Sequence, residues 1–124
     1  PWMSGGGCLI ARDFLRMGLL FARKGWGVGN RQVGSPSFLE KTIKNLGPKY
    51  MKLSKNKYLY YSNSTMVTEN MIGHSGYGGQ FLATNFKTGK VAAFFSVLET
   101  KSATKESYKT DMINMLTNLV NDNS

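Results

Sequence analysis

Two apolar strand-like segments and a following amphipathic helix set the fold of the C-terminal half. Residues 79–85 and 91–98 are rich in apolar, aromatic and β-branched side chains. Residues 86–90 between them are turn-like, with Gly89 free to adopt a positive φ. We expect an antiparallel hairpin. Because the first five residues of 91–98 carry no polar side chain, we expect this segment to be a central strand.

Helical periodicity predicts three helices. Residues 104–121 place apolar side chains three and four positions apart, as one stripe that would lie across the hairpin. The stripe consists of Tyr108, Met112, Ile113, Leu116, Leu119 and Val120. Residues 11–24 form a second pattern, apolar on nearly every side and ended by Gly25. Ser35 as N-cap and Pro36 at the first turn open a third helix, which runs to about Asn45.

These elements define the expected fold class. A tyrosine-rich strand is predicted over residues 58–62. The class is therefore α+β, part of an α/β sandwich: an antiparallel hairpin packed by a C-terminal helix, with two further helices. A length of 124 residues fits one domain or part of one. The longest apolar run is far shorter than the roughly 20 residues of a transmembrane helix, so no membrane span is expected.

The charge of the chain raises the question of a polyanionic partner. The net charge is +9, from 16 Lys and Arg against 7 Asp and Glu. Basic residues interleaved with aromatic ones can bind single-stranded nucleic acid or an acidic surface. The basic cluster comprises Lys41, Lys44, Lys49, Lys52, Lys55 and Lys57, beside Tyr50, Tyr58, Tyr60 and Tyr61. A solvated, lysine-rich connection between core elements is the favoured explanation, and nucleic acid is the less expected partner because no RNA-binding or zinc-finger signature is present.

Metal and disulfide chemistry are constrained by residue counts. The chain has one cysteine, Cys8, and one histidine, His74. These exclude an internal disulfide and any metal site that needs two histidines or several cysteines. Cys8, flanked by Gly7 and Leu9, is expected to be a small buried residue. No metal and no cofactor is expected.

The most informative motif lies directly before the hairpin. Residues 73–80 read Gly-His-Ser-Gly-Tyr-Gly-Gly-Gln. The triplet His74-Ser75-Gly76, the glycine turn and the strand pair resemble the third active-site motif of the serine β-lactamase-related hydrolases. The similarity is to the branch of class C β-lactamase-like esterases, D-aminopeptidases and aminohexanoate-oligomer hydrolases. Residues 5–18 and 25–36 resemble two further family segments in the same order, whereas residues 46–70 match only loosely.

The resemblance implies hydrolysis of a small-molecule ester, amide or lactam through an acyl-serine, without metal or cofactor. The implied catalytic residues are His74, Ser75, Gly76 and Tyr77. The backbone N–H of Tyr77 would stabilise the oxyanion, and the glycines would let substrate approach the backbone. His74 would place a positive or hydrogen-bonding group near the nucleophile, since its unperturbed pKa is about 6.5. A surface histidine before a turn is the alternative explanation.

The family nucleophile, Ser-x-x-Lys, and its Tyr-x-Asn motif should lie upstream of these segments. Formal matches begin at Ser54, Ser102 and Tyr61, but each stands in the wrong context or chain order. Helix capping is the simpler role for Ser102. We therefore expect residues 1–124 to be the C-terminal portion of one such domain. The isolated chain would be inactive and completed by an N-terminal part that carries the nucleophile. A small basic binding module is the main alternative, and a non-catalytic relative of the family is another.

Overall fold

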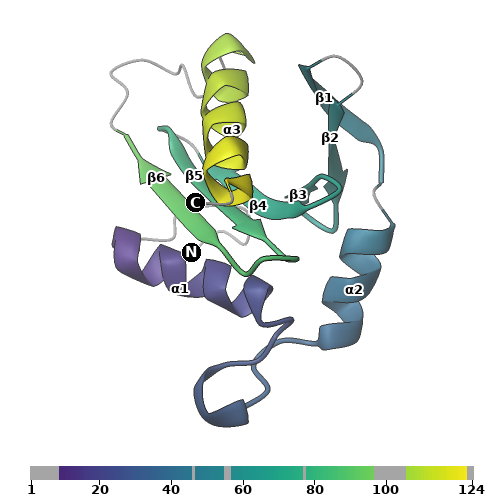
Figure 1. Cartoon of the computed structure of the whole chain (residues 1–124), viewed down its shortest axis with the longest axis vertical. Coiled ribbons are helices and arrows are strands. Elements are labelled where there is room, and N and C mark those ends of the chain that lie inside the picture. Colours follow the sequence, from purple (N-terminus) through teal and green to yellow (C-terminus); the bar gives the residue numbers. More distant parts are fainter. Residues whose placement is uncertain (1–8, 46, 55–56, 77, 97–105, 123–124) are drawn as a thin grey trace.

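A computed structural model describes residues 9–45, 47–54, 57–76, 78–96 and 106–122. Among these residues an antiparallel six-stranded sheet carries three α-helices, so the α+β class is confirmed (Figure 1). The strands follow one another in the sheet in chain order. The elements are α1 (Ala11–Ala22), α2 (Pro36–Lys44), β1 (Lys49–Ser54), β2 (Lys57–Ser62), β3 (Thr65–Val67), β4 (Met71–Gly76), β5 (Gln80–Asn85), β6 (Val91–Phe95) and α3 (Glu106–Asn121).

Strands β5 and β6 form the predicted hairpin. Gln80 pairs with Phe95 and Thr84 with Val91, and Gly89 in the turn has a φ of 78°. The expected central position of residues 91–98 is wrong, because β6 is the last strand of the described sheet and ends at Phe95. Residues 97 and 98 lie outside the described residues. The apolar composition of β6 has another cause: helices cover both of its faces, which buries side chains without a second neighbouring strand.

Helix α3 covers one face of the sheet. Its buried side chains pack on those of β2 to β6 in the larger core cluster, which comprises Leu59, Met66, Met71, Phe81, Ala83, Ala92, Ile113, Leu116 and Val120. Tyr108 and Met112 pack against the edge of this cluster, as the predicted stripe requires. Leu119 does not take part and is 60% exposed. Residues 104 and 105, where the helix was expected to begin, lie outside the described part of the chain.

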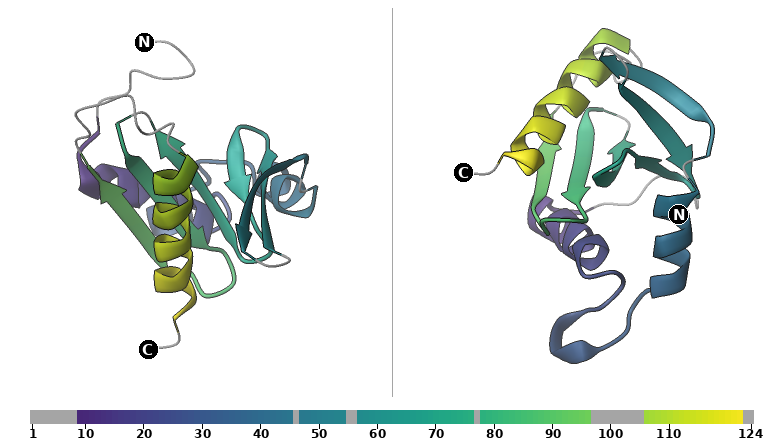
Figure 2. Two further views of the ribbon diagram at one scale, coloured as in Figure 1. Left: turned by 90° about the horizontal axis from the view of Figure 1, so that it is seen from above. Right: turned by 45° about the vertical axis from the view of Figure 1, so that its right-hand side comes forward.

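Helices α1 and α2 cover the opposite face (Figure 2). Gly18 is the buried residue of α1, and a Cβ there would contact the side chains of Leu82 and Val91. Phe14 packs on Phe95, with ring centroids 5.4 Å apart. This close approach of helix to sheet holds α1 against the hairpin. The remaining apolar side chains of α1 are half-buried or exposed, so the helix buries little of its surface.

The local signals at the helix ends are confirmed. Ser35 caps α2 by accepting a hydrogen bond from the backbone N–H of Phe38 at 3.3 Å, and Pro36 occupies the first turn. The N–H of Gly25, with a φ of 90°, donates to the carbonyl of Leu20 at the end of α1. The expected lysine-rich connection is in part a strand, because residues 49–54 form β1 and pair with β2.

Candidate functional site

The triplet His74-Ser75-Gly76 forms the end of β4, an interior strand of the sheet. On one side these three residues pair with β5, opposite Leu82, Phe81 and Gln80 respectively. On the other side β3 pairs with β4 only as far as Gly73, which lies opposite Met66. Within the described sheet, residues 74–76 therefore have no strand on the β3 side. The motif presents an open backbone edge there.

A pocket of about 290 Å³ lies at this open edge. Its walls come from four strands and from α3: Tyr50, Tyr61, Met66, His74, Ser75 and Lys109. The rings of Tyr50 and Tyr61 are neighbours, with centroids 5.5 Å apart. The ammonium group of Lys109 donates a hydrogen bond to the hydroxyl of Tyr50 at 2.6 Å. The pocket thus combines a cation, two aromatic rings and an open strand edge.

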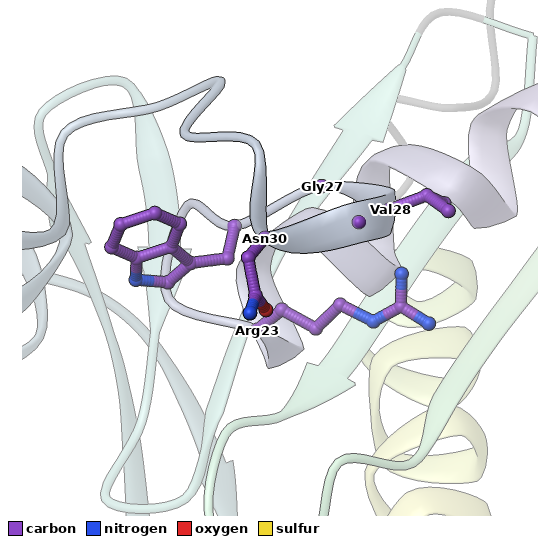
Figure 3. A pocket seen from close by; sticks show the side chains of 6 residues that line it. Arg23, Gly27, Val28 and Asn30 are labelled. Carbon is purple, nitrogen blue, oxygen red and sulfur yellow. The ribbon is translucent and has the colours of Figure 1, made fainter.

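Two larger pockets, of about 570 and 690 Å³, lie at the loop that follows α1. Figure 3 shows the larger one, with Arg23, Val28 and Asn30 among its lining residues. Val28 is 85% exposed, and neither pocket includes a residue of the triplet. Because these pockets are open surface hollows beside a protruding loop, the smaller pocket at β4 is the better candidate site.

His74 and Ser75 point to opposite faces of the sheet, because successive side chains of a strand alternate. The ring of His74 stacks on Phe21 of α1, with centroids 6.5 Å apart. Ser75 pairs with Phe81, whose ring packs on Tyr108 of α3. The two side chains of the motif therefore do not converge on one point. Ser75 faces the side of Lys109, and His74 faces α1.

The environment of His74 controls its charge. Burial lowers the pKa of His74 from its usual 6.5, because a partly buried imidazolium loses hydration. Among the described residues no group forms a hydrogen bond with the ring and no carboxylate pairs with it. At neutral pH the ring is therefore uncharged. It can act as a hydrogen-bonding group or a proton acceptor, but it does not supply a positive charge.

Two glycines, Gly73 before the triplet and Gly76 at its end, have neighbouring atoms close to where a Cβ would lie. A Cβ on Gly73 would overlap the carbonyl oxygen of Leu82 in β5. A Cβ on Gly76 would lie 2.8 Å from the side-chain oxygen of Gln80. Gly78 and Gly79 follow with φ values of 81° and 89°, which form the predicted glycine turn into β5. Tyr77, the expected oxyanion donor, lies outside the described residues.

The formal matches to the other family motifs occupy structural positions. Ser62 is buried and donates a hydrogen bond to the carbonyl of Asn45 at 2.7 Å. The amide of Asn63 donates to the hydroxyl of Thr42 in α2 at 2.8 Å. These bonds hold the β2–β3 turn against α2. Ser54 is an exposed residue at the end of β1 and does not open a helix. Cys8 and Ser102 lie outside the described residues.

Sequence reasoning did not identify Lys109 or Met66 as members of the site. Lys109 is 59 residues from Tyr50 along the chain, and only the packing of α3 against β1 brings them together. Tyr50 and Tyr61 stand beside the lysines of the basic cluster in the sequence, but no local pattern connects them with Ser75. The one available signal was the position of Lys109 next to Tyr108 in the apolar stripe of the helix.

In the comparisons with known proteins, no family model matches this chain and no curated protein matches it significantly. In the described part of the chain, no three residues among His, Cys, Asp and Glu group together as metal ligands. None of the described helices combines the length and the apolar character needed to cross a bilayer.

Proposed function

We propose that this chain is the C-terminal part of a β-lactamase-related serine hydrolase that cleaves an ester, amide or lactam through an acyl-serine. The observation that carries the proposal is the open edge of β4 at residues 74–76, beside the 290 Å³ pocket. An unpaired strand edge offers backbone N–H and C=O groups to an extended acyl group. The motif lies on β4, and the glycine turn, the β5–β6 hairpin and α3 follow it in the chain. This is the order of elements that the family resemblance implies.

The chemistry assigns different roles to the residues of the motif. A serine hydroxyl of the proposed N-terminal part attacks the acyl carbon and gives its proton to a general base of the same part, and the carbonyl electrons move onto the carbonyl oxygen. The family resemblance assigns the stabilisation of that oxyanion to the N–H of Tyr77, which lies outside the described residues. The tetrahedral intermediate then collapses, the leaving group departs with a proton, and water releases the acyl group from the serine. Neutral His74 contributes a hydrogen-bonding ring on the α1 side.

Among the described residues no strand pairs with the outer edge of β6, and this edge supports the same proposal. The carbonyl of Lys90 accepts from Asn85 and the N–H of Ser96 donates to Gly79, so even-numbered residues of β6 bond to β5. The backbone groups of Val91, Ala93 and Phe95 consequently face outward. Edge strands of complete proteins usually carry charges, proline or bulges that prevent pairing, and β6 has no charge or proline. This edge suits a further strand from the proposed N-terminal part.

Three experiments test the proposal. The coding sequence upstream of residue 1 should contain Ser-x-x-Lys and Tyr-x-Asn in frame, and a reading frame without them would contradict it. Co-expression of the upstream segment with this chain should restore labelling by a fluorophosphonate probe, on the upstream serine. The chain alone should hydrolyse neither nitrocefin nor p-nitrophenyl acetate. Turnover by the chain alone that disappears in Ser54→Ala would overturn the assignment of the nucleophile.

A basic binding module is the second candidate, and the β1–β2 hairpin favours it. Lys49, Lys52 and Lys57 are exposed there, and the ammonium group of Lys49 lies 4.1 Å from the ring centroid of Tyr58. Polyanion binding through these lysines releases counterions, so affinity should fall steeply with salt. Titration of oligo(dT) at 50 and 200 mM salt measures this. A steep slope that Lys52→Gln and Lys57→Gln reduce would favour the second candidate over the hydrolase.

A further inference from the structure

The pocket at the β4 edge contains one fixed positive charge. Lys109 is half-buried on α3, and its ammonium group bonds to Tyr50 and lies 4.5 Å from the centroid of the same ring. An ammonium group has three N–H donors, of which Tyr50 takes one. Among the described side chains, no carboxylate lies within ion-pair distance of Lys109. The charge is therefore held in place by a neutral group and directed to the pocket.

The position of Lys109 depends on the packing of α3 against β1. The start of α3 reaches across to the β1–β2 hairpin (Figure 2), where the hydroxyl of Thr110 lies 3.3 Å from the sulfur of Met51. The amide of Asn114 bonds to the carbonyl of Leu53 one turn further along. These contacts, at residues that follow Tyr50 in β1, hold the strand beside the helix. Lys109 and Tyr50 thus form a partly exposed, hydrogen-bonded pair that the packing of α3 on β1 brings together.

The other lining residues supply two phenol rings, a hydroxyl, a thioether and an imidazole: Tyr50, Tyr61, Ser75, Met66 and His74. The residues Tyr50 and Tyr61 are 50% and 43% exposed, so a flat ligand can reach them. Ser75 is half-buried on the same face of the sheet, and its hydroxyl has no hydrogen-bond partner among the described residues. A hydroxyl and an ammonium group together suit a carboxylate, whose two oxygens each accept a hydrogen bond.

Size and charge define the ligand class. A volume of about 290 Å³ lies just below the roughly 300–1,000 Å³ typical of small-molecule sites, which suits a ligand of about one ring. One cation matches a monoanion better than a phosphate dianion, which needs more than one positive group. We propose that this pocket binds a small aromatic carboxylate, with its carboxylate on Lys109 and Ser75 and its ring against Tyr50 and Tyr61. The identification of this carboxylate as the acyl substrate rests on the proposed hydrolase function, whereas the binding of the carboxylate does not.

The test is an NMR titration of the whole 124-residue chain with benzoate, against neutral benzamide and against acetate, which lacks the ring. Benzoate should shift the amide signals of Tyr50, Tyr61, Ser75 and Lys109 in a saturable manner. Benzamide and acetate should each bind about tenfold more weakly, because benzamide lacks the negative charge and acetate lacks the ring. Equal binding of benzoate and benzamide, or no shift at these amides, would overturn the proposal.

Matched lysine variants separate the site from the general positive charge. Lys109→Met should weaken benzoate binding about tenfold, and Lys109→Arg should retain most of it. Lys87→Met removes the same charge at the β5–β6 turn and should leave affinity within about twofold. An equal loss in Lys87→Met and Lys109→Met would contradict the proposal, as would undiminished binding in a folded Lys109→Met.

Failure of this inference can be distinguished from failure of the proposed hydrolase function. Benzoate binding without any hydrolase activity, even with the upstream segment present, would retain this inference and reject the hydrolase. Hydrolysis by the complemented protein without saturable benzoate binding at these amides would support the hydrolase and reject this inference.

Discussion

The ring of His74 on β4 stacks on the ring of Phe21 on α1, with 6.5 Å between their centroids and 28° between their planes. This contact removes one side of the imidazole from water and disfavours its protonated form. The motif therefore presents a neutral histidine toward α1 at physiological pH, while its serine lies on the opposite face beside Lys109. Because His74 and Ser75 lie on opposite faces of the sheet, the histidine controls the pH response and the serine belongs to the pocket of Lys109.

The first prediction concerns the dependence of stability on pH. The pKa of His74 lies below 6.5 in the folded chain, whereas the unfolded chain titrates near 6.5. As the pH falls below 6.5 the unfolded state binds a proton that the folded state does not, so the free energy of unfolding decreases until the folded pKa is reached. At pH values well above 6.5, the contribution of His74 to the free energy of unfolding does not change with pH. Urea denaturation at pH 7.5, 6.5 and 5.5 measures it.

The His74→Gln variant is the control for this effect, because it lacks the titrating ring but retains the carboxylates. Its free energy of unfolding should fall less than that of the wild type between pH 7.5 and 5.5. Parallel curves for the two proteins would show that His74 does not titrate differently on folding.

A second prediction concerns Gly18, where α1 approaches the sheet most closely. A Cβ there would lie 3.0 Å from side-chain atoms of Leu82 and Thr84, and closer still to Val91. Gly18→Ala should therefore destabilise the fold by roughly 1–3 kcal/mol, although alanine favours a helix by about 1 kcal/mol over glycine. Met17→Ala, one position away and exposed, should cost less than about 1 kcal/mol. A Gly18→Ala protein more stable than wild type in thermal denaturation would contradict the close packing of α1.

The third prediction concerns Asn85, which ties α3 to the β5–β6 turn. Its side-chain oxygen accepts hydrogen bonds from the backbone N–H groups of Lys87 and Thr88, at 2.9 and 3.0 Å. Its amide donates to the side chain of Asn121 at 2.7 Å. Since Asn85 is buried, Asn85→Ala should cost about 2–3 kcal/mol.

Chemical denaturation compares this variant with Asn114→Ala, whose amide makes one 3.4 Å bond to a carbonyl. The control should lose less than about 1 kcal/mol, because a single long hydrogen bond contributes little. Equal losses would mean that the Asn85 network does not connect helix and turn as the structure shows.

A fourth prediction concerns hydrogen exchange in β6. The N–H groups of Ala92 and Phe94 bond to β5, and those of Val91, Ala93 and Phe95 face the open edge. The first two amides should therefore exchange slowly and the other three rapidly in the isolated chain. Addition of the proposed N-terminal part should slow all five. Uniform protection in the isolated chain would show that another segment or a second copy already occupies this edge.

The sequence alone was sufficient for the elements whose signals are local. The Ser35 cap, the positive φ of Gly89 and the helical stripe that includes Met112 and Leu116 all act within a few residues, and the structure contains each of them. For the same reason the hairpin of β5 and β6 was predictable from its two apolar runs and its turn. These features decide the α+β class.

Only the tertiary structure decided which strands are neighbours and which side chains share a pocket. An apolar run such as Val91–Phe95 indicates buried faces, and helices on both faces meet that requirement as well as a second neighbouring strand does, so its edge position could not be predicted. The separation of His74 from Ser75 follows from strand alternation once β4 is known. The pairing of Lys109 with Tyr50 depends on α3 crossing to β1, a contact between segments 59 residues apart that no local pattern encodes.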